Sequence, residues 1–172
     1  VRFRASEWNV NPNKIGMLGF SAGGHLTATV GTNYDFKHPA LSPERDEINQ
    51  ESAKLNALVL CYAVISLTKH THKGVIQNLF GKSPTKKALE RFSAENAVDE
   101  NTPPTFLWHT EEDQSVPVEH AYLFAKSLKK HHVEHELNVF KTGKHGLGLA
   151  QGVPGTEEWT KKCADWLKSI GF

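Results

Sequence analysis

The stretch Gly19-Phe20-Ser21-Ala22-Gly23-Gly24 decides the fold that we expect for this chain. It follows a short apolar run, residues 15–18, and precedes a segment that can form a helix. A Gly-x-Ser-x-Gly pattern between a strand and a helix is typical of a nucleophile elbow, a sharp turn that exposes the serine at the tip of the strand. The serine backbone is strained there, so its neighbours must lack bulk, as Gly19 and Gly23 do. Gly24 is expected to let the helix pack closely. The pattern also occurs by chance in loops, so the strand and helix around it are what favour the elbow.

Two later segments place an acid and a histidine directly after predicted strands. Residues 105–109 predict a short buried strand followed by an acidic loop with Asp113, and residues 137–141 predict another strand followed by His145. The carboxyl ends of parallel strands lie at one edge of a sheet, where sites are commonly built. Ser21, Asp113 and His145 can therefore meet in space, and they follow one another in the order that this kind of elbow requires.

These residue types suit acyl transfer through a serine. A serine hydroxyl is a poor nucleophile until a base takes its proton. His145 is the candidate base, and Asp113 is the candidate for holding the imidazole in the productive tautomer. The backbone N–H of Ala22 is a candidate hydrogen-bond donor to the oxyanion.

The acid has two competitors in the same loop. Glu111 and Glu112 precede Asp113 and could also approach the histidine. We prefer Asp113 because it lies closest to a helix that is expected to begin at Pro117, a residue type suited to the first helical position.

The base has competitors too, since the chain contains ten histidines. We prefer His145 because glycines flank it and a strand precedes it. His109 ends a strand and is expected to be structural. His70 and His72 flank a loop threonine, but no second ligand cluster with zinc-like spacing accompanies them, so neither a metal nor another cofactor is expected.

Length and composition predict one domain over residues 1–172. The net charge of +1 implies neither a nucleic-acid nor an anionic-membrane partner. No apolar run is long enough to span a membrane, and no signal peptide is visible. Two cysteines, Cys61 and Cys163, are expected to be free thiols in the core.

Alternating strands and helices predict an α/β fold, a three-layer sandwich around a mostly parallel sheet. Strands are expected at Lys14–Phe20, Leu55–Ala63, 105–109 and 137–141, and helices at 22–31, 74–80, 85–92, 118–130 and 156–170. Polar residues 34–52 predict a loop or flap. Two helices have an apolar face, made of Val118, Ala121, Tyr122, Ala125 and Leu128 in one and of Trp159, Cys163, Trp166, Leu167 and Ile170 in the other.

A set of ordered motifs spans nearly the whole chain: Gly19–Leu26, Tyr62–Ser66, Asn78–Gly81, Arg91–Glu95, Thr102–Phe106, His109–Asp113, Val116–Glu119 and Gly143–Gly148. On these motifs the chain resembles the C-terminal portion of an α/β-hydrolase esterase, and is most similar to the bacterial lipase and acetylesterase group that includes acetylxylan-esterase-like enzymes. The resemblance implies a triad of Ser21, Asp113 and His145. It also implies a small-molecule or carbohydrate ester as substrate, hydrolysed at a short acyl group.

The chain departs from this family before the elbow. The family carries a His-Gly-Gly-Gly-like or Pro-Gly-Gly-like loop there, which completes the oxyanion hole, but the eighteen residues before Gly19 contain none. We therefore expect an α/β-hydrolase domain that lacks its N-terminal strands. The strand Lys14–Phe20 would then have an unpaired, apolar edge, and we expect it to pair with a missing N-terminal segment or with a second copy of the chain.

Three functions remain open on the sequence. The leading hypothesis is a serine esterase acting on short-chain, acetyl-like esters. The second is a serine peptidase of the prolyl-oligopeptidase kind, which typically has an aromatic residue where Ala22 stands here. The third is a non-catalytic fragment that keeps the triad but lacks a complete oxyanion hole.

Overall fold

The computed structural model describes residues 1–34 and 47–172 of the chain. Its sheet has four strands in the order β1-β2-β3-β4, and every neighbouring pair is parallel. The strands are β1 (Gly16–Phe20), β2 (Ala57–Cys61), β3 (Thr105–Thr110) and β4 (His135–Phe140). Each lies within two residues of its predicted bounds, so the expected parallel sheet is confirmed.

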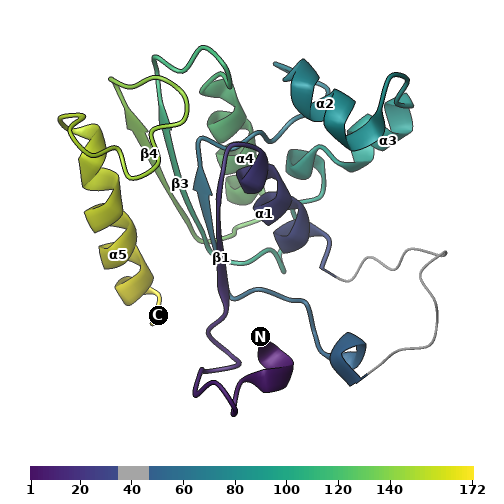
Figure 1. Cartoon of the computed structure of the whole chain (residues 1–172), viewed down its shortest axis with the longest axis vertical. Coiled ribbons are helices and arrows are strands. Elements are labelled where there is room, and N and C mark those ends of the chain that lie inside the picture. Colours follow the sequence, from purple (N-terminus) through teal and green to yellow (C-terminus); the bar gives the residue numbers. More distant parts are fainter. Residues whose placement is uncertain (35–46) are drawn as a thin grey trace.

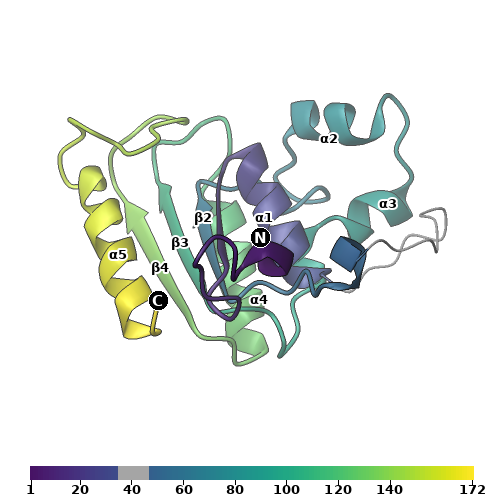
Figure 2. The ribbon, with the colours of Figure 1, turned by 60° about the horizontal axis from the view of Figure 1, so that its bottom comes forward.

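Helices cover both faces of this sheet. They are α1 (Ala22–Thr32), α2 (Lys73–Phe80), α3 (Lys86–Arg91), α4 (Glu119–Lys130) and α5 (Trp159–Ser169), with short 3₁₀ turns at Arg2–Arg4, Glu47–Gln50, Ala94–Asn96 and Thr156–Glu158. Figure 1 shows α5 alone on one side of the strands and α1 with α4 on the other, and Figure 2 shows the same three layers from a second direction. Helices α2 and α3 form a separate arm beyond α1 (Figure 1).

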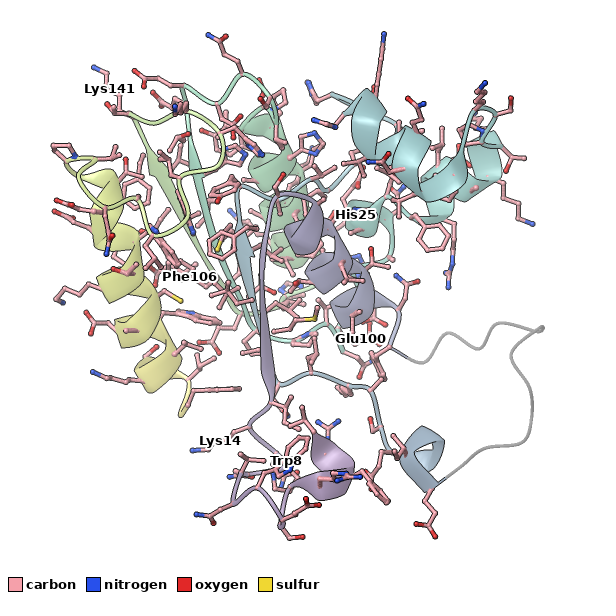
Figure 3. All side chains as sticks on the ribbon, viewed as in Figure 1. Trp8, Lys14, His25, Glu100, Phe106 and Lys141 are labelled. Carbon is pink, nitrogen blue, oxygen red and sulfur yellow. The ribbon has the colours of Figure 1, made fainter. Side chains whose placement is uncertain are left out.

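The core is divided between the two faces by the alternation of strand side chains. Leu60 and Leu107 pack with Phe124 and Leu128 in the cluster beneath α1 and α4. Their neighbours in sequence point the other way, so that Phe106 joins the aromatic cluster beneath α5 (Figure 3). Since every residue of β2 is buried, this strand is covered on both faces, as its apolar sequence predicts.

Two predictions about α4 are wrong. The helix begins at Glu119 rather than at Pro117, because the chain first winds through i→i+3 bonds, from the His120 N–H to the Pro117 carbonyl and from the Ala121 N–H to the Val118 carbonyl. Its apolar face also excludes Tyr122, which is 46% exposed. The buried face consists of His120, Ala121, Phe124, Ala125 and Leu128, and Tyr122 lies to one side of it.

The face predicted for α5 is confirmed. Trp159, Cys163 and Trp166 are buried in the aromatic cluster, with Leu167 and Ile170 packed against it. Both cysteines are free and buried, as expected. The α-helix itself starts three residues later than predicted, because residues 156–158 form a 3₁₀ turn.

Strand β1 lies at one edge of the described sheet, with Leu18 47% exposed. The partner that we expect for this edge stays a prediction. Residues 35–46 of the predicted flap lie outside the described residues. Among the helices that are described, none combines the length and the apolar character needed to cross a bilayer.

Candidate active site

Ser21 forms the link between β1 and α1 in a conformation that is rare for a residue with a side chain. Its φ of 52° and ψ of −115° lie outside the common regions for L-residues. Hydrogen bonds hold this backbone in place: the Ser21 N–H donates to the Cys61 carbonyl at 3.0 Å, and the Ser21 carbonyl accepts from the N–H groups of His25 and Val64 at 3.1 and 3.2 Å. A strained residue that is fixed by its neighbours is typical of a functional site.

Close packing explains two of the three glycines of the elbow. A Cβ on Gly19 would lie 2.2 Å from the Gly23 carbonyl oxygen, and one on Gly24 would lie 2.4 Å from the Cβ of Ala63. Both glycines are therefore needed for the helix to approach the strand. Gly23 was expected for its lack of bulk, but a Cβ there would meet no atom of the described residues within 4 Å, so close packing does not explain this glycine.

The structure brings the serine, the histidine and the preferred acid together. Ser21 Oγ lies 2.8 Å from His145 Nε2, and the Nδ1–H of His145 donates to Asp113 Oδ2 at 2.6 Å. The Asp113 side chain is fully buried, while that of His145 is 22% exposed. The other carboxylate oxygen, Oδ1, accepts from the N–H groups of Ser115 and Val116, each at 2.9 Å. Both carboxylate oxygens are thus fixed, and Nε2 is left to accept the serine proton.

The loop after β4, which carries the imidazole, is fastened to the sheet at one end. The Thr110 hydroxyl donates to the Gly143 carbonyl at 2.7 Å, and the Gly143 N–H donates to Glu112 Oε2 at 2.9 Å. The Thr156 hydroxyl donates to the Thr142 carbonyl at 2.6 Å. Glu112, one competitor for the acid role, therefore holds the loop instead of the imidazole.

The other predicted residues take different positions. Ala22 is the first residue of α1, so its N–H is one of those that a helix leaves without an internal partner. Glu111 is exposed at the rim. His109 is fully buried in β3, and its Nδ1 lies 2.9 Å from the N–H of Thr110. His72 caps α2 through its Nδ1, which accepts from the Val75 N–H.

One neighbour of the imidazole was not predicted as a site residue. Tyr62 directly follows β2, and its ring centre lies 5.0 Å from that of His145 at an angle of 71°. Its hydroxyl accepts a hydrogen bond from the Gly148 N–H at 2.9 Å. The sequence motif at Tyr62 contributes to the family resemblance, but nothing in that motif shows that the ring reaches the loop of the histidine.

A second missed residue fastens the chain after β2. The Nδ1 of His120 accepts from the N–H groups of Ile65 and Ser66, and its Nε2–H donates to the His70 carbonyl at 2.9 Å. Burial lowers the pKa of His120, and also lowers the pKa values of His25 and His109. Burial thus favours the neutral form of all three imidazoles.

No metal ligand set is found in residues 1–34 and 47–172, where no group of three or more His, Cys, Asp or Glu side chains could hold an ion. The serine, the imidazole and the carboxylate lie together at the carboxyl edge of the sheet. Lys141 marks this edge in Figure 3, while Trp8 and Lys14 lie at the opposite end of the molecule.

Comparison with known proteins places the chain in a family. The BD-FAE family model matches residues 1–128. The chain belongs to the BD-FAE family. An endo-1,4-beta-xylanase B of Butyrivibrio fibrisolvens is 37% identical to this member over 150 residues, which are 87% of the chain but 23% of that protein. An acetylxylan esterase of Xylanibacter ruminicola is 31% identical over 175 residues, which cover 99% of the chain and 33% of that protein.

A solved structure supports the fold assignment. The acetyl ester-xyloside bifunctional hydrolase of Caldicellulosiruptor lactoaceticus superposes with a TM-score of 0.94 and 47% identity, over 100% of this BD-FAE chain and 62% of that one. The expected α/β-hydrolase esterase fold is thereby confirmed. The chain spans about a quarter to a third of the length of the two curated relatives, and less than two thirds of this solved structure.

Proposed function

We propose that this BD-FAE chain carries the catalytic centre of a serine carboxylester hydrolase, and that its substrates are short-chain acyl esters of carbohydrates. The observation that supports the proposal is the continuous hydrogen-bonded series from Ser21 Oγ through the imidazole of His145 to the buried carboxylate of Asp113. Hydrolases that act through an activated serine use such a series.

In the proposed mechanism, Ser21 Oγ attacks the carbonyl carbon of the ester while His145 Nε2 takes the hydroxyl proton. Asp113 stabilises the imidazolium that forms, and the Ala22 N–H donates to the oxyanion. The C–O bond to the alcohol then breaks, the alcohol leaves with the proton from Nε2, and the acyl group stays on Ser21. Water, deprotonated by the same imidazole, releases the acid and restores the serine.

The surface beside the imidazole favours a polar alcohol as the leaving group. A hollow of about 620 Å³ opens next to the site, and it is lined by Glu111, Glu112, Gln114, Ser115, Lys144 and His145. All of these side chains are polar or charged, so they suit the hydroxyl groups of a sugar better than an alkyl chain. The similarity to the acetylxylan esterase and to the acetyl ester-xyloside bifunctional hydrolase also supports a carbohydrate ester.

The test is hydrolysis of acetylated xylo-oligosaccharides and of p-nitrophenyl acetate by the full protein and by its Ser21→Ala variant. We expect kcat to fall about 10⁶-fold, as when the serine of a well-studied triad is removed. A fluorophosphonate should label Ser21 in the wild type. Ser83→Ala is the matched control, because it removes an exposed serine hydroxyl from residues 81–85, which connect α2 to α3. Ester hydrolysis or labelling that survives Ser21→Ala contradicts the proposal, and cleavage of a proline anilide would favour a peptidase.

A further inference from the structure

Tyr62 has a backbone conformation that its side chain does not favour. Its φ is 37°, in the left-handed region that bulky residues avoid. The backbone is nevertheless held, because the Tyr62 N–H donates to the Trp108 carbonyl at 2.9 Å and the preceding carbonyl, of Cys61, accepts from the Ser21 N–H. The same peptide segment is thus tied both to β3 and to the elbow, and the strain is maintained by contacts with the site.

The ring that this conformation projects lies among aromatic groups. Its centre is 5.0 Å from that of Trp108, at 89°, and 5.7 Å from that of Phe20. Tyr62 is 5% exposed, and the imidazole of His145 is a third aromatic neighbour of its ring. Because two neighbours fix the tyrosine ring, this ring can act as a rigid wall that limits the rotation of the imidazole.

The Tyr62 hydroxyl binds the loop that carries His145, at a point after the histidine. Gly143 is tied to Thr110 and Glu112 before the histidine, and the Gly148 N–H is tied to the Tyr62 hydroxyl after it. Gly148 has a φ of 58°, and a glycine restricts its own backbone little, so the bond to Tyr62 adds a constraint there. Burial raises the pKa of Tyr62, which keeps the phenol protonated.

We propose that Tyr62 is a positioning residue for His145, with the ring bounding the imidazole and the hydroxyl fixing the distal end of its loop. The inference rests on the proposed function, because it assigns to Tyr62 the task of keeping Nε2 in line with Ser21 Oγ. Small errors in such an alignment reduce the rate of chemistry far more than they weaken substrate binding.

The test compares Tyr62→Phe and Tyr62→Leu in the full protein, with p-nitrophenyl acetate as substrate. Tyr62→Phe keeps the ring and loses one neutral hydrogen bond, so kcat should fall about three- to tenfold with KM unchanged. Tyr62→Leu also loses the wall and should lower kcat about 100-fold. Tyr122→Phe removes the hydroxyl of an exposed tyrosine on α4 and is the matched control, with kcat expected at the wild-type value.

A second measurement does not depend on activity. The Nδ1 proton of His145, held in the 2.6 Å bond to Asp113, should give a far-downfield proton NMR signal. This signal should broaden in Tyr62→Phe through faster exchange with water, and stay sharp in Tyr122→Phe. The proposal is overturned if Tyr62→Phe keeps both the wild-type kcat and the sharp signal, or if KM rises while kcat does not change.

These outcomes separate the inference from the function on which it rests. If the wild type hydrolyses no ester, the proposed function fails and the NMR comparison alone decides whether Tyr62 orders the imidazole. If Tyr62→Leu does not fold, Tyr62→Phe still decides, because it changes no packed carbon atom.

Discussion

The carboxylate of Asp113 is held on both of its oxygens, and one of them, Oδ2, lies 2.6 Å from Nδ1 of His145. Oδ1 accepts two backbone N–H bonds in the turn that leads toward α4 (Glu119–Lys130), so the acid cannot rotate without breaking them. The two oxygens therefore have different partners, the imidazole for Oδ2 and two backbone N–H groups for Oδ1. These partners decide how an amide side chain would orient in the same place.

Asp113→Asn should lower kcat by about 10⁴-fold, as the equivalent change does in a well-studied triad. The asparagine carbonyl is expected to take the Oδ1 position, because the two backbone N–H groups need an acceptor there. Its NH₂ group then faces Nδ1 of His145, and the imidazole has to carry its proton on Nε2, where it can no longer accept the proton of Ser21. Steady-state kinetics with p-nitrophenyl acetate would measure the loss.

Asp165→Asn is the control for this substitution. Asp165 is an exposed carboxylate on α5 that pairs with Lys161. Helix α5 lies on the opposite side of the strands from α1 (Figure 1). The same chemical change there should leave kcat at the wild-type value, since exposed pairs of this kind contribute little. An Asp113→Asn enzyme as active as Asp165→Asn would remove the acid from the mechanism.

The free energy of unfolding should decrease as the pH falls below about 6.5. Burial lowers the pKa values of His25, His109 and His120 in the folded state, so the unfolded chain binds more protons than the folded one in this range. Their stabilising effect is complete above the pKa of the unfolded histidines and is lost as acid is added. Urea unfolding between pH 8 and pH 5 would measure the slope.

His120→Asn tests the contribution of one of these groups. The asparagine carbonyl can accept from Ile65 and Ser66 as Nδ1 does, whereas the bond to the His70 carbonyl is lost. We expect a lower free energy of unfolding than in the wild type at pH 8. Below pH 6.5 this free energy should fall less steeply with pH than in the wild type, and the difference in slope is at most about 1.4 kcal/mol per pH unit for one titrating group. An unchanged slope would show that His120 is not among the groups that cause the acid sensitivity.

Much of this site could be predicted from sequence because each residue follows the end of a strand. The elbow, Asp113 and His145 all lie in short connections at the carboxyl edge of a parallel sheet, where strand order alone brings them together. The apolar run of β2 and the short buried strand β3 could also be predicted, and both strands are buried along their whole length. Catalytic roles at these positions stay a proposal.

The parts that could not be predicted depend on backbone geometry or on distant contacts. Tyr62 contacts the histidine loop from a backbone with a positive φ, and a tyrosine in a sequence does not predict that conformation. Glu112 and Asp113 are adjacent, and only the three-dimensional path of the loop decides which of them faces the imidazole. The start of α4 could not be predicted to the residue, because Pro117 suits both the first turn of a helix and a turn with i→i+3 bonds that precedes one.

The two cysteines should resist alkylation in the folded protein. Burial raises the pKa of the Cys61 thiol to about 12 and that of Cys163 to about 11, so almost no reactive thiolate is present at pH 8. Iodoacetamide should modify neither residue in buffer and both in urea, as read by peptide mass mapping. Modification of Cys61 in buffer would mean that the sheet opens beneath α5 under native conditions.

The glycines of the elbow should respond in opposite ways to the same substitution. Gly24→Ala places a methyl group 2.4 Å from the Cβ and 2.9 Å from the Cα of Ala63, and the backbone there cannot retreat without moving β2. We expect a loss of about 1–3 kcal/mol in the free energy of unfolding, as for other overpacked sites.

Gly23→Ala is the matched variant, because it adds the same methyl group one residue earlier on α1 and meets no described atom within 4 Å. It should stabilise the fold by about 0.4–1 kcal/mol, since alanine restricts the unfolded chain more than glycine does. Urea unfolding of both variants at pH 8 gives the comparison. If Gly23→Ala destabilises as much as Gly24→Ala, a group outside residues 1–34 and 47–172 packs against the first turn of α1. Gly23 would then be needed to let that group approach the helix.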